Sequence, residues 1–115
     1  MNNLERWFKR NALAEKKESE GKSEDAIELY EANVEEDAET LFTYERLSIL
    51  YRRRGDRQNE RRILSLAISK LKYREEHGPW DENLAQQLQQ FYVRLEELES
   101  AKKNPEKKKG WFNRS

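Results

Sequence analysis

The sequence contains no cysteine and a single histidine, His77, among its 115 residues. Without cysteine there can be no disulfide bond, no thiolate metal ligand and no cysteine nucleophile. One imidazole cannot supply the several ligands of a typical zinc site. Carboxylates are abundant, but runs such as Glu35-Glu36-Asp37 have the pattern of a solvated helix end, not of the partly dry pair that acid–base catalysis needs. We therefore expect no metal, no cofactor and no enzymatic activity.

Long apolar runs are also absent. No stretch approaches the roughly 18 apolar residues of a membrane-spanning helix. The first ten residues, MNNLERWFKR, lack the apolar centre of a signal peptide. The sequence therefore predicts a protein without a transmembrane segment, and a cytoplasmic location.

Charge is plentiful and unevenly placed. Charged residues make up 40% of the chain and hydrophobic residues 35%, and the formal net charge is zero. Residues 14–40 carry eleven acids against three lysines, residues 46–74 carry ten bases against two acids, and residues 101–115 carry six bases and one acid. The pattern indicates an acidic end and a basic end, or simply well-solvated helical faces.

Glycine and proline are rare, and all of them lie outside the segments with helical apolar spacing. No segment alternates apolar and polar residues over the length of a strand. The sequence therefore predicts an all-α fold of about five helices, over residues 3–20, 24–36, 38–54, 57–73 and 81–102. Gly21 and Gly55 are expected to end helices, and the expected N-caps are Ser23, Asp56 and Asp81. In the first helix the residues available for burial are Leu4, Trp7, Phe8, Leu13 and Ala14.

The fifth segment carries a regular apolar stripe of Leu84, Leu88, Phe91, Leu95 and Leu98. Its 4-3-4-3 spacing is that of one helix face. We expect this face to pack on the third and fourth helices as a capping helix. The alternative is the seam of a homodimer, because a heptad of this regularity also pairs two chains.

A shift of 34 residues superimposes the first two helix pairs. It places Gly21 on Gly55, the pair Leu13-Ala14 on Leu47-Ser48, and Tyr30 on Leu64. This period, with a large and a small residue side by side in the first helix and a glycine in the turn, resembles the tetratricopeptide repeat family. Ala26, Tyr51 and Ala67 also match the family pattern. Glu60 matches the small residue that opens the second helix less well than Ala26 does. The departures are Lys17 in place of an aromatic residue, Asn33 in place of a small residue, and Ala38 and Lys72 in place of prolines.

The resemblance implies antiparallel helix pairs in a short right-handed solenoid. It divides a single domain of residues 1–103 into repeat one at about 7–40, repeat two at about 41–74 and a capping helix at about 81–103. Residues 104–115 are expected to form a flexible basic tail.

The same resemblance implies a non-enzymatic interaction module or adaptor, expected to bind a peptide or partner protein in a concave groove lined by the first helix of each pair. Phe42 and Ile49 lie seven residues apart and away from the main stripe of Leu47 and Tyr51, as residues of a binding surface would. The groove positions are Phe8, Asn11, Glu15 and Glu18 in the first helix, and Phe42, Glu45, Ile49, Arg52 and Arg53 in the third.

Two other functions stay open. The stretch YRRRGDRQNERR, residues 51–62, holds six arginines that could neutralise nucleic-acid phosphates, although the zero net charge and the nearby acids argue against this. The other is a self-assembling structural protein. A homodimer could form through the fifth helix or through the tail, where Trp111 and Phe112 follow three lysines. These two aromatics could dock into the acidic half of a neighbouring copy, touch anionic lipid, or remain free.

Overall fold

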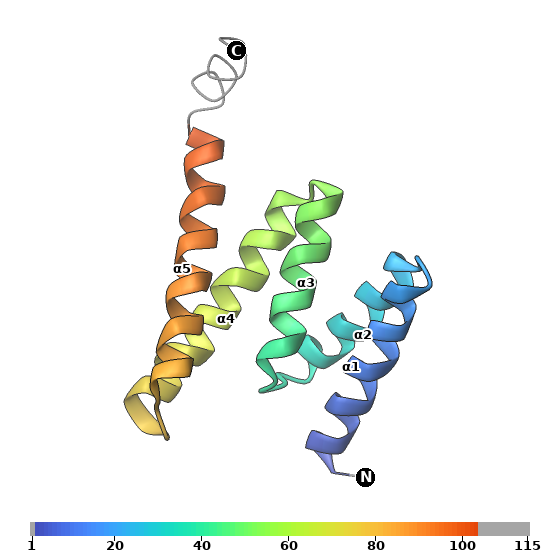
Figure 1. Ribbon diagram of the computed structural model, residues 1–115, viewed down its shortest axis with the longest axis horizontal. Coiled ribbons are helices and arrows are strands. Elements are labelled where there is room, and N and C mark those ends of the chain that lie inside the picture. The colour runs from blue at the N-terminus through green and yellow to red at the C-terminus, as the bar shows by residue number, and fades with distance from the viewer. Residues whose placement is uncertain (1, 104–115) are drawn as a thin grey trace.

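The structure is a computed structural model that describes residues 2–103. These residues form five helices and no strand: α1 (Asn3–Ser19), α2 (Ser23–Glu35), α3 (Leu41–Arg54), α4 (Arg57–His77) and α5 (Glu82–Lys103). Each helix packs against the next one along the chain, and Figure 1 shows α1 and α5 at opposite ends of the row. The all-α prediction is therefore confirmed. Within residues 2–103, no helix combines the length and the apolar character needed to cross a membrane.

Two of the expected N-caps are present. The Asp56 carboxylate accepts a hydrogen bond from the backbone amide of Asn59 at 3.2 Å, and that of Asp81 accepts one from Leu84 at 2.8 Å. Each satisfies an amide that has no partner inside its helix. The third cap is wrong, because Ser23 is the first residue of α2 and Lys22 precedes it without a side-chain cap.

Two helix boundaries also differ from the prediction. α3 begins at Leu41, not at residue 38, because Asp37 adopts a left-handed backbone with φ of 57° and Thr40 is extended. The connection is fixed by the Tyr44 hydroxyl, which donates a hydrogen bond to the carbonyl of Ala38 at 2.8 Å. α4 continues four residues past the predicted end, to His77, since nothing before Gly78 breaks the helix.

The core lies between consecutive helices. Its largest fully buried apolar side chains are Tyr30, Tyr44, Leu47, Ile63, Leu64 and Leu71. Ala14, Ala26 and Ala67 have no exposed surface, as expected where helices approach closely. The α5 stripe joins this core, with Leu88, Phe91 and Leu98 buried and Leu84 and Leu95 packed against it. Because α5 packs chiefly on α4, its apolar face is used inside the chain.

The first helix buries less than its sequence suggested. Leu4, Phe8 and Leu13 are 51%, 55% and 45% exposed, whereas Trp7 and Ala14 are buried. α1 is the outermost helix of the row and packs chiefly on α2, so the sides of α1 that face away from α2 and α3 have no neighbouring helix in the described part of the chain. Leu13 thus differs from Leu47, its counterpart 34 residues on, which is fully buried between α3 and its neighbours.

The turn after α3 gives a direct stability prediction. Gly55 has φ of 73°, a left-handed conformation that strains any residue with a Cβ, although no atom lies within 4 Å of the added carbon. We expect Gly55→Ala to lower the free energy of unfolding by about 1 kcal/mol, measured by urea denaturation. Gly78→Ala is the matched control, because Gly78 has φ of −129° and would place its Cβ in ordinary contact with Arg74. An equal loss in both variants would contradict this explanation.

Candidate functional site

Four buried polar side chains link the first three helices. Asn33 on α2 donates through Nδ2 to the Trp7 carbonyl and to Asn11 Oδ1, both at 3.0 Å. Asn11 on α1 donates to Thr40 Oγ1 at 3.0 Å and accepts from Thr43 Oγ1 at 2.7 Å. The two threonine hydroxyls lie 2.7 Å apart. We call Asn11, Asn33, Thr40 and Thr43 the polar network.

The polar network corrects the prediction for Asn11. That residue was expected to line a partner-binding groove, but it is only 6% exposed, and its amide makes hydrogen bonds to Asn33, Thr40 and Thr43 inside the molecule. Asn33, a departure from the family pattern, is completely buried at the centre of the same network. Since buried amides are costly without hydrogen bonds, these residues fix how α1, α2 and α3 meet.

A cluster of charged side chains joins the first half of α1 to Glu36, the residue that follows α2. The Glu36 carboxylate pairs with Arg6 at 2.8 Å and Arg10 at 2.9 Å and accepts a hydrogen bond from Trp7 Nε1 at 3.1 Å. Arg10 also donates to Asn33 Oδ1 at 3.2 Å, which connects the cluster to the polar network. The hydrogen bonds from Arg10 and Arg6 lower the pKa of Glu36 from 4.5 to about 2.

The lowered pKa of Glu36 predicts a pH dependence. Because its folded-state pKa lies below the value of 4.5 expected when unfolded, its contribution to stability is present above pH 4.5 and is lost as the pH falls towards 2. We expect Glu36→Gln to lose less stability than the wild type between these pH values, measured by urea denaturation at each pH. Glu35→Gln is the control, since Glu35 is exposed and makes no ion pair in the described residues. Parallel pH profiles for wild type and Glu36→Gln would contradict the prediction.

A second carboxylate joins α1 to α3. Glu18 accepts from Arg46 Nε at 3.2 Å and from the Tyr30 hydroxyl at 2.7 Å. Burial alone would raise the pKa of Glu18, but the hydrogen bonds from Arg46 and Tyr30 outweigh it and hold the pKa below its usual value. Burial, and then the bond to Glu18, raise the pKa of the Tyr30 hydroxyl. Side-chain contacts therefore connect α1 to α3 at two positions along α1, at Asn11 and at Glu18.

The bonds made by Asn11 and Glu18 show which sides of α1 and α3 face each other. Phe8 lies one turn before Asn11, and Phe42 lies one turn before Arg46, so each phenylalanine shares a flank with a residue that bridges the two helices. Phe8 is 55% exposed and Phe42 is 40% exposed, with its ring edge-on to Tyr30 at 6.2 Å. The rest of this surface has Glu15 exposed and Glu45 and Ile49 half-buried. We call Phe8, Glu15, Phe42, Glu45 and Ile49 the α1–α3 face.

The other two predicted positions lie near the end of α3. Arg52 pairs with Glu97 of α5 at 3.6 Å and lies 3.7 Å from the buried Glu60, while Arg53 is exposed. Burial raises the pKa of Glu60 above its usual value despite the nearby Arg52. Arg94 of α5 donates to Ser48, so α5 is tied to α3 as well as packed on α4. Arg52 therefore contacts α4 and α5 while about half of its side chain, 51%, stays exposed.

Most of the arginine-rich stretch is already paired within the chain. Arg54 pairs with Glu24 at 3.1 Å, Arg62 with Glu31, and Arg61 with Glu99. With the contacts of Arg52, four of the six arginines in this stretch form ion pairs within the chain, while Arg53 and Arg57 are exposed. The nearby acid Glu60 could be expected as a partner from the sequence, whereas Glu24, Glu31 and Glu99 are brought to these arginines by the fold.

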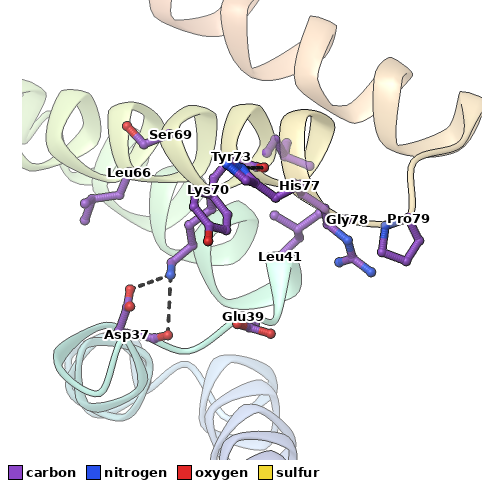
Figure 2. Close-up of a pocket in the computed structure, with 12 residues that line it drawn as sticks. Asp37, Glu39, Leu41, Leu66, Ser69, Lys70, Tyr73, His77, Gly78 and Pro79 are labelled. Atoms are coloured by element: carbon purple, nitrogen blue, oxygen red, sulfur yellow. Dashed lines mark hydrogen bonds and ion pairs between the residues drawn. The ribbon is translucent and has the colours of Figure 1, made fainter.

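A pocket that the sequence did not indicate lies beside the last turns of α4. It has a volume of about 670 Å³ and lies between α4 and the segment that leads into α3. Figure 2 shows Lys70 reaching from α4 to Asp37, and Tyr73 and His77 following it along the same side of the helix. The Tyr73 and His77 rings stack with centroids 4.2 Å apart, and Tyr73 is 67% exposed. Two of its lining residues, Arg74 and His77, belong to the part of α4 that lies beyond its predicted end.

The remaining predicted contacts, Trp111 and Phe112, lie outside the described residues. Within residues 2–103 no three His, Asp or Glu side chains gather as a metal site would require. Comparison with protein-family models, with curated proteins and with solved structures gives no match to this chain. Its function must therefore be argued from the α1–α3 face and the pocket themselves.

Proposed function

We propose that the chain is a non-enzymatic interaction module that binds a peptide or partner protein through the α1–α3 face. In this proposal the helices form antiparallel pairs in a short, right-handed tetratricopeptide-like solenoid, with α5 as its cap. The observation that carries it is the exposure of Phe8 and Phe42 on adjoining flanks of α1 and α3. Apolar side chains that are exposed together and bordered by charge are typical of helix- and peptide-binding surfaces.

Two further features support the proposal. Gly21 and Gly55, which lie 34 residues apart, both have left-handed backbones, with φ of 75° and 73°. The α1–α3 face also has a rigid support beneath it, since the polar network and the Glu18–Arg46 pair fix α1 against α3. A face held in one shape loses little conformational entropy when a partner binds.

The test is to select binders from a random library of amphipathic peptides against the full chain, and then to measure their affinity for Phe8→Ser and Phe42→Ser. Each variant is expected to weaken binding about tenfold or more, because each removes an apolar anchor of the face. Tyr92→Ser is the control, since Tyr92 on α5 is 38% exposed, close to the 40% of Phe42. Circular dichroism confirms that each variant is folded. Selected peptides that bind the Phe variants as tightly as the wild type would contradict the proposal.

A further inference from the structure

The pocket beside α4 has both apolar and polar lining residues and an exposed aromatic side chain. Leu41 and Leu66 line it together with Tyr73, while Lys70, Arg74 and His77 lie on the α4 side. Lys70 is engaged by Asp37, and the Nδ1 atom of His77 lies 2.9 Å from the Tyr73 carbonyl. A flat aromatic side chain could insert against Tyr73 and the leucines, burying surface that is now exposed to water.

The pocket adjoins an acidic stripe on α2. That helix has no lysine or arginine, and Asp25, Glu28 and Glu35 share one exposed side of it at spacings of three and seven residues. None of the three makes an ion pair with another described residue. Glu35 is the last residue of α2, and two residues beyond it Asp37 begins the pocket wall. A ligand seated in the pocket would therefore extend over a row of negative charge.

The chain itself contains a segment with the complementary chemistry. Residues 107–112, KKKGWF, place three lysines directly before two aromatics. We propose that this segment of one copy binds a second copy, with Trp111 and Phe112 in the pocket and the lysines along the acidic stripe. The four residues from Lys107 to Trp111 span at most about 14 Å, so with Trp111 in the pocket the lysines reach the Glu35 end of the stripe, which is roughly 15 Å long from Asp25 to Glu35.

The position of the pocket favours a second copy over the same chain. The proposed segment follows Lys103, the last residue of α5, and α5 packs on α4. The pocket lies away from α5, on the side of α4 that faces Asp37, so the segment of the same chain would have to pass around α4 to enter it (Figure 2). One segment and one pocket per copy form a contact between unlike surfaces, so it joins copies head to tail or in a reciprocal pair.

Sedimentation of the full chain from about 10 µM to about 1 mM tests the proposal. The wild type is expected to gain mass above the monomer as concentration rises, and to lose this gain in 0.5 M salt because the lysine–acid attraction is screened, the Debye length being roughly 4 Å there. Trp111→Ala/Phe112→Ala and, separately, Tyr73→Ala should each move the association about tenfold or more to higher concentration. Tyr92→Ala, an exposed tyrosine on α5, should leave it unchanged.

Mixing the two defective variants gives the sharpest result. The tail variant retains its pocket and Tyr73→Ala retains its tail, so the mixture should form pairs where neither variant does alone. A monomeric wild type over the whole range, wild-type association by Tyr73→Ala, or a mixture that stays monomeric would each overturn the proposal. Loss of association in Phe42→Ser instead of Tyr73→Ala would also overturn it, and would place the tail on the α1–α3 face. The proposed binding of a partner at that face is tested separately and can stand or fall independently.

Discussion

Asn33→Ala is expected to lower the free energy of unfolding by about 2 to 3 kcal/mol, a large fraction of the 5 to 15 kcal/mol typical of a domain. The substitution removes the amide's hydrogen bonds to the Trp7 carbonyl and to Asn11 Oδ1, together with the bond accepted from Arg10, from a position with no exposed surface. It leaves Asn11 with fewer partners in a dry environment and opens a small cavity between three helices. Alanine's higher helix propensity offsets only about 0.6 kcal/mol of this.

Urea denaturation followed by circular dichroism measures the loss. Asn83→Ala is the matched control, because Asn83 is exposed on α5 and makes no hydrogen bond that joins it to another helix. Its stability should stay within about 0.5 kcal/mol of the wild type. A loss below 1 kcal/mol in Asn33→Ala would show that the polar network does not fix the first three helices.

Phe91→Ala is expected to cost about 3 kcal/mol or more. Phe91 is 2% exposed, sits at the centre of the α5 stripe and stacks beneath the Arg94 guanidinium at 5.7 Å from the ring centre. Its removal leaves a cavity against α4 and weakens the support of Arg94, which donates to Ser48 of α3. Since α5 is the terminal helix of the row, the loss should appear first as unfolding of α5.

The same measurement decides between the two uses of the α5 stripe. If the stripe packs within the chain, the loss in Phe91→Ala is independent of protein concentration. Tyr92→Ala, the adjacent exposed position, should cost less than about 1 kcal/mol. A wild-type stability that rises with protein concentration, and a variant that loses this dependence, would instead support a homodimer seam.

The helices could be predicted because the chain places its few glycines at their ends and its apolar residues on one side of each. The start of α3 could not, because it depends on the left-handed conformation of Asp37 and on the hydrogen bond that Tyr44 sends back to Ala38. The continuation of α4 to His77 was missed because a polar stretch was interpreted as a loop, although it contains no helix breaker before Gly78.

The exposure of a site residue could be predicted where it depends on the residue's position in one helix. It could not be predicted where it depends on contacts with several helices. Phe8 and Phe42 were identified from their helical positions, and both are exposed. Asn11 was assigned to the same surface, but its partners Thr40 and Thr43 come from a segment about 30 residues away. The 34-residue period alone does not show that this segment lies beside Asn11. The one available signal was an asparagine at core spacing, four residues after Trp7 and three before Ala14, which is typical of a buried amide that needs partners.

The pocket depends on α4 meeting the segment before α3, so only the folded chain reveals it. Residues 107–112 are recognisable in the sequence as a basic and aromatic segment. The pocket, with its aromatic and acidic surroundings, is the surface to which we propose that this segment binds.

Two-dimensional ¹H–¹⁵N NMR of the full chain, titrated with the tightest peptide from the library selection, tests the central claim most directly. If α1 and α3 present the binding surface, the perturbed amide resonances will cluster around Phe8 and Glu15 on α1 and around Phe42 and Ile49 on α3, with Tyr73 and His77 unaffected. Perturbations centred on the pocket or on α5, with the resonances of the α1–α3 face unchanged, would contradict it.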